Sequence, residues 1–238
     1  MGKTKTEKSG FSFSAILRNQ LFIPIAALLL LALFNLIMDP SFYAIRLGEN
    51  ADGFKVLSGN LISILDMGSE LAILAIGMTL VTAATGGQDI SVGATIAIAG
   101  SVILRVVCGG EQSVTEYKAP VVVALIIAIV VSMIFGAFNG MLVAIFNIQP
   151  MVATLILFTA GRSIAAWINN NTLPVVNVKS FGIFGNYIPG FPIPTPFIIA
   201  MICVLLIFLV LKFTTLGLYT QAVGINENSS RLNGINPI

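Results

Sequence analysis

The chain has 238 residues, of which 57% are hydrophobic and only 9% are charged, and its formal net charge is +2. Soluble domains carry about 25% charged residues, so this composition indicates an integral membrane protein, and it argues against a nucleic-acid-binding domain with a basic surface. The chain contains no histidine and only two cysteines, so neither a metal nor another cofactor is expected.

Six apolar segments predict an all-α fold, a polytopic membrane helical bundle of about six transmembrane helices. The segments cover residues 21–38, 61–84, 92–107, 119–146, 150–168 and 195–211. All but the third approach or reach the length of about 20 residues that a spanning helix needs. We therefore expect a cytoplasmic tail at 1–20, a transmembrane domain at 21–212 and a cytoplasmic segment at 213–238.

The distribution of lysine and arginine predicts the orientation of these segments. Basic residues gather before the first segment and after the last one: Lys3, Lys5, Lys8, Arg18, Lys212 and Arg231. The loops 39–60 and 109–118 instead carry more acidic than basic residues. Because basic residues favour the cytoplasmic side, we expect an even number of crossings with both chain ends in the cytoplasm.

A polar, glycine-rich break separates the second and third segments. It reads Gly-Gly-Gln-Asp-Ile-Ser-Val-Gly over residues 86–93 and lies between two uncharged runs, 71–84 and 92–104. Each run is only about 20 Å long as a helix, whereas the hydrocarbon core is ~30 Å thick, so we expect the break to dip into the membrane. An aspartate at that depth costs about 2.5–3.5 kcal/mol, so Asp89 needs a local reason to be there.

Two roles are compatible with this break. Asp89 and Ser91 can cap the helix that begins at residue 92. Short segments interrupted by glycine also mark substrate pathways, where the backbone turns and approaches a ligand closely. Asn139 and Thr154, from later segments, can line the same pathway, although packing between helices is the simpler role for each. The candidate pathway residues are Gly86, Gly87, Gln88, Asp89, Ser91, Gly93, Asn139 and Thr154.

The residues after the last segment predict a short polar helix in the cytoplasm. Asn226 is a typical N-cap, Glu227 suits the first turn, Arg231 suits the last turn, and Gly234 is a C-terminal stop. Such a helix is either a solvated connection or a projection that docks in a groove of a partner. Residues 169–194, rich in Asn, Gly and Pro, predict an external loop with turns and room for a short helix.

Several motifs together resemble the permease subunits of bacterial ABC sugar importers of the ribose and galactose type. The motifs are AIGMTLV at 75–81 with the break at 86–93, IQPMVATL at 148–155 with AGR at 160–162, and AVGIN at 222–226. The resemblance runs from about residue 64 to the end, and within the family it is closest to galactofuranose importer permeases. Members of the family continue with several more membrane helices, so we expect this chain to be C-terminally truncated.

The resemblance implies a permease domain at 21–212 that moves a monosaccharide, galactofuranose- or ribose-like, across the bacterial inner membrane. It implies three protein partners: a cytoplasmic ABC ATPase subunit, a second permease subunit, identical or different, and a periplasmic or extracellular sugar-binding protein. The segment held by the ATPase would include Gly224, Asn226, Glu227, Arg231 and Gly234. The chain has no Gly-x-x-x-x-Gly-Lys-Ser/Thr motif, so it is not expected to be an enzyme, and ATP hydrolysis is expected in the separate subunit.

Two alternatives are open at this point. An ion-coupled secondary transporter needs intramembrane carboxylates as relays, and Asp89 is the one deep candidate. ABC permeases for branched-chain amino acids or nucleosides share the same sequence pattern, so the sequence does not select the substrate.

Overall fold

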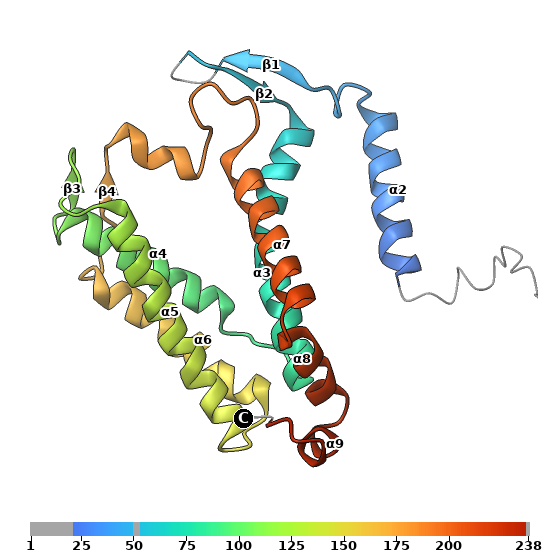
Figure 1. The fold of residues 1–238 in the computed structure, drawn as a ribbon. Coiled ribbons are helices and arrows are strands. Elements are labelled where there is room, and N and C mark those ends of the chain that lie inside the picture. Colours follow the sequence, from blue (N-terminus) through green and yellow to red (C-terminus); the bar gives the residue numbers. More distant parts are fainter. Residues whose placement is uncertain (1–20, 50–52, 237–238) are drawn as a thin grey trace, which may run out of the picture. The chain divides into compact units, whose positions relative to one another are not determined.

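The computed structural model describes residues 21–49 and 53–236. The predicted tail at 1–20 and the last two residues of the predicted cytoplasmic segment lie outside these ranges. In chain order the elements are α2 (Phe22–Met38), β1 (Arg46–Glu49), β2 (Lys55–Ser58), α3 (Asn60–Thr85), α4 (Val92–Cys108), β3 (Ser113–Val114), α5 (Val121–Ala144), α6 (Pro150–Ile168), β4 (Val175–Val176), the 3-10 helix η1 (Lys179–Phe184), α7 (Thr195–Phe213), α8 (Leu216–Ile225) and α9 (Glu227–Leu232) (Figure 1).

The described chain is mainly helical, as predicted, and each predicted apolar segment corresponds to one helix whose ends agree within two residues. Four helices, α3, α5, α6 and α7, are long and apolar enough to cross a membrane. The helices α2 and α4 have 17 residues each and are shorter. The predicted number of about six crossings therefore depends on these two shorter helices.

The chain divides into two compact units, one of Met1–Gly48 with Leu57–Ile64 and the other of Glu49–Val56 with Leu65–Ile238. In the first unit, no side chain of α2 is buried. An apolar helix with no buried side chain is what a lipid-facing segment requires.

The core of the second unit lies where α4 packs between α5 and α6 (Figure 1). The buried residues of this core are Ile98, Val102, Ala128, Leu157 and Ala165. Gly161 of α6 faces Ala94 of α4 so closely that a Cβ at Gly161 would lie 2.7 Å from the Ala94 Cβ. Small residues at this crossing let the two backbones approach, which is the usual source of helix association in lipid.

Two short two-stranded sheets, β1 with β2 and β3 with β4, were not predicted. The strands β3 and β4 run parallel, with Ser113 opposite Val175. Side chains reinforce this link between the α4–α5 and α6–α7 loops, because the Tyr117 hydroxyl lies 2.7 Å from the Ser180 hydroxyl. The predicted loop at 169–194 contains turns and the short helix η1.

Candidate functional site

The glycine-rich break begins where α3 ends at Thr85. Gly86 has a left-handed φ of 65°, which glycine adopts without strain and which stops the helix. At Gly87 a Cβ would lie 2.6 Å from Cβ and Cγ of Pro150, so only glycine lets the break lie directly on the start of α6. The two glycines therefore have different physical roles, a turn at Gly86 and a close contact at Gly87.

Asp89 holds the start of α4 through its own carboxylate. Its Oδ1 accepts hydrogen bonds from the Ser91 amide at 2.7 Å and from the Ser91 hydroxyl at 2.6 Å. Ser91 occupies the N-cap position, but its hydroxyl accepts no hydrogen bond from the first turn of α4. The predicted cap is thus correct in position, because Ser91 is the N-cap residue, but neither the Asp89 nor the Ser91 side chain accepts a hydrogen bond from the first turn of α4. The Ser91 hydroxyl donates to Asp89 instead.

Asn139 and Thr154 contact the break from two other helices. The Asn139 Nδ2 donates to the Ser91 Oγ at 2.9 Å. The Thr154 hydroxyl accepts from the Ile90 amide at 3.1 Å and donates to the Pro150 carbonyl at 2.9 Å. Ser91, Asn139 and Thr154 are 1%, 5% and 3% exposed, so they form a buried polar network that fixes the break against α5 and α6.

One atom of this network lacks a partner. The Asn139 Oδ1 is buried and accepts no hydrogen bond from the described residues. A buried unpaired carbonyl oxygen is costly, so any change that also frees the Asn139 amide nitrogen leaves the whole side chain unsatisfied.

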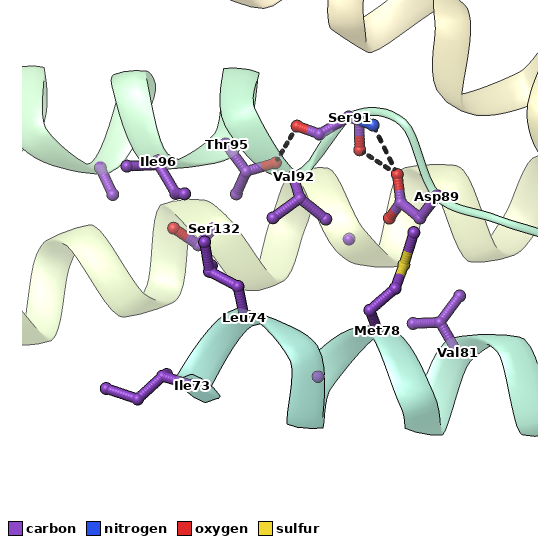
Figure 2. Close-up of a pocket in the computed structure, with 13 residues that line it drawn as sticks. Ile73, Leu74, Met78, Val81, Asp89, Ser91, Val92, Thr95, Ile96 and Ser132 are labelled. Carbon is purple, nitrogen blue, oxygen red and sulfur yellow. Dashed lines mark hydrogen bonds between the residues drawn. The ribbon is translucent and has the colours of Figure 1, made fainter. Parts of the chain in front are cut away.

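A groove of about 340 Å³ opens beside this network, between α3, α4 and α5. Asp89 and Ser91 line one end, and Ser132 of α5 and Thr95 of α4 line it further along (Figure 2). The α3 side is apolar and consists of Ile73, Leu74, Gly77, Met78 and Val81. Figure 2 shows Met78 reaching toward the Asp89 carboxylate from this apolar wall.

Sequence reasoning did not select Ser132, although a signal was present. Ser132 precedes Asn139 by seven residues, which is two helical turns, so both lie on the same face of α5. Gly136, between them, also lines the groove. The face of α5 that carries Asn139 therefore also carries Ser132 and Gly136.

Of the eight predicted pathway residues, two, Asp89 and Ser91, line the groove. Gly87, Asn139 and Thr154 instead take part in the contacts of the break with α5 and α6. Gln88 and Gly93 are exposed and do not line the groove, and the space beside Gly93 is open.

Gly86 lines a second cavity, of about 300 Å³, together with three of the five predicted ATPase-coupling residues, Gly224, Asn226 and Glu227. Arg231 and Gly234 do not line it. The break thus borders both the groove, at Asp89 and Ser91, and the cavity that residues 223–227 line, at Gly86.

Residues 226–234, which the sequence predicts to form a short capped helix, have that local structure. The Asn226 side chain accepts a hydrogen bond from the Ser229 amide at 2.9 Å and caps α9. Glu227 and Arg231, four residues apart, form an ion pair at 3.4 Å. Gly234, with a φ of 80°, follows the end of the helix. In the described part of the chain, no group of three or more His, Cys, Asp and Glu residues could hold a metal ion.

Comparisons with known proteins agree with this architecture. A family model described as the permease component of a branched-chain amino acid transport system matches residues 60–238. The chain is 39% identical to the galactofuranose transporter permease of Escherichia coli (strain K12), over 89% of the chain and 58% of that protein. It is 34% identical to the fructose import permease FruF of Bifidobacterium longum (strain NCC 2705), over 99% of the chain and 63% of that protein.

The ribose import permease of Escherichia coli (strain K12) is also 34% identical, over 89% of the chain and 60% of that protein. The chain thus spans 58–63% of the length of these relatives. No solved structure matches the chain.

Proposed function

Because the chain belongs to the family of permease components matched over residues 60–238, we propose that it is the substrate-conducting subunit of an importer driven by a separate ATPase. The observation that carries the proposal is that this family match includes both the glycine-rich break and the capped helix α9. The chain itself is a multi-pass membrane protein, and we place it in the bacterial inner membrane.

We propose a monosaccharide as the substrate. The relatives reported above are named for galactofuranose, fructose and ribose. In the groove, the Asp89 carboxylate and the Ser132 hydroxyl offer polar oxygens to sugar hydroxyls, whereas the α3 wall is apolar. A few polar contacts on a mainly apolar wall bind weakly enough for a substrate to leave, which conduction requires.

The contacts of Asp89 favour this function over ion-coupled transport. Its Oδ1 accepts two hydrogen bonds from Ser91 and so holds the start of α4. Proton relays use chains of carboxylates or histidines, whereas among the described residues no second carboxylate lines the groove beside Asp89. The driving force is then supplied by a partner, and rigid-body rocking of the helices around the pathway converts it into alternating access.

Two experiments test the proposal. Deleting residues 226–233 should abolish co-purification with the ATPase subunit, whereas Leu173→Ser, in the α6–α7 loop, should leave co-purification unchanged. Uptake of labelled ribose, fructose, galactose and leucine by cells that express the complete importer then identifies the substrate class. Leucine uptake without sugar uptake would show a branched-chain amino acid permease, and uptake that follows the proton gradient at constant ATP would show a secondary transporter.

A further inference from the structure

We infer that the elbow between α8 and α9, residues 222–227, and the end of α3 move as one body, joined by a contact between Gly224 and Ala83 that only glycine permits. Gly224 is then a positioning residue, which acts on the pathway through the break. The inference rests on the proposed function, because the motion it transmits is the one an ATPase would produce at α9.

The contact at Gly224 explains why a glycine stands there. A Cβ at Gly224 would overlap the carbonyl oxygen of Ala83 and would lie 3.0 Å from the Ala83 carbonyl carbon. Gly224 lies inside α8, and its φ is not left-handed. Glycine in a helix is less favourable than alanine by about 0.5–1 kcal/mol, so the missing Cβ serves the close approach and not the backbone conformation.

The break is held at two further points beyond Ala83. Gly87 lies against Pro150 at the start of α6, and the Ile90 amide donates to the Thr154 hydroxyl. Gly86 lies in the chain between the contact of Ala83 with Gly224 and the contact of Gly87 with Pro150. A Cβ at Gly86 would meet open space, so the backbone can bend there. A displacement of the elbow therefore moves the end of α3 and reaches the break at Gly86.

The break leads directly to the groove. Asp89 lies between the two held positions, Gly87 and Ile90 on either side of it, and its carboxylate lines the groove. The cavity beside the Gly224 contact is lined by residues of the elbow, of the end of α3 and of the α5–α6 link. These are the parts that a movement of α9 meets first.

The first test is Gly224→Ala in the complete importer. We expect ATPase co-purification to stay unchanged and ATP-driven uptake to fall about two- to thirtyfold, the range of mutations that weaken coupling between sites. The matched control is Gly100→Ala on α4, where the added Cβ meets open space, and it should leave uptake unchanged. Unchanged uptake in Gly224→Ala would overturn the inference. Loss of co-purification with the ATPase would also overturn it, because Gly224 would then act in docking and not in transmission.

The second test does not require the Gly224 variant to fold. Ala84→Cys and Val223→Cys line the same cavity on the two sides of the contact and can be joined by a short thiol-reactive crosslinker. If the elbow and the end of α3 move together, the crosslinked importer should retain its uptake. Uptake that stops on crosslinking and returns after cleavage of the linker would overturn the inference.

A third measurement separates this inference from the proposed function. In the chain purified alone, with Cys203 replaced by serine, the maleimide labelling rate of Gln88→Cys reports the conformation of the break. Gly224→Ala should change this rate, and Gly100→Ala should not. If the native chain binds no ATPase the proposed function fails, whereas an unchanged labelling rate refutes the mechanical link.

Discussion

Removal of the Ser91 hydroxyl is the sharpest test of the buried polar network. Ser91→Ala deletes two hydrogen bonds, one from the Asn139 amide at 2.9 Å and one to the Asp89 carboxylate at 2.6 Å. Interhelical hydrogen bonds in membrane proteins contribute about 0.6–1.7 kcal/mol each, so we expect a loss of about 1–3 kcal/mol in the free energy of unfolding.

A second substitution makes the prediction specific to this network. In Ser91→Ala both the nitrogen and the oxygen of the Asn139 amide are unpaired, because the Oδ1 already lacks a partner among the described residues. Replacing Asn139 by leucine, of similar volume, removes both unpaired groups. Asn139→Leu should therefore destabilise the native chain but restore stability to Ser91→Ala.

The assay is unfolding in mixed micelles with increasing sodium dodecyl sulfate, followed by circular dichroism. Ser132→Ala is the matched control, because that hydroxyl has no partner in the described part of the chain, and it should change stability by less than about 0.5 kcal/mol. If the effects of Ser91→Ala and Asn139→Leu add to within about 0.3–0.5 kcal/mol, the two residues are independent and the network as described does not exist.

Three further predictions follow from single contacts. Gly161→Ala would place its Cβ 2.7 Å from the Ala94 Cβ and should cost about 1–3 kcal/mol in the same unfolding assay. Asn226→Ala removes the cap of α9 and should destabilise that helix by about 0.5–2 kcal/mol, seen as faster amide exchange within it, whereas Asn226→Ser should not. The pKa of Tyr187 is raised, first by burial and then by the Asp66 charge. The contribution of Tyr187 to stability is therefore fully present below the ordinary tyrosine pKa of 10.0, and it is lost as the pH rises through the higher pKa of the folded chain. Absorbance titration should show that Asp66→Asn lowers the pKa of Tyr187, and an unchanged titration would contradict that charge effect.

The positions of the apolar helices and of the short helix α9 follow from the local sequence. Runs of apolar residues bounded by Gly, Pro and polar residues place each helix, because the membrane requires every backbone group to be paired within its own segment. The cap at Asn226, the ion pair between Glu227 and Arg231 and the stop at Gly234 join residues within one or two turns. These features depend on residues that are neighbours in the chain, so the spacing of those residues in the sequence is enough to predict them.

The members of the site were decided by tertiary structure. Asn139 and Thr154 bind residues that are 48 and 64 positions away, whereas Gln88 and Gly93, inside the break itself, are exposed. Helical periodicity identifies the face on which a residue lies but not the helix that packs against that face. The pairing of β3 with β4 and the approach of Gly224 to Ala83 likewise join distant segments. The sequence by itself therefore determined the helices and the cap of α9, and only the packing of those helices decided which polar groups meet.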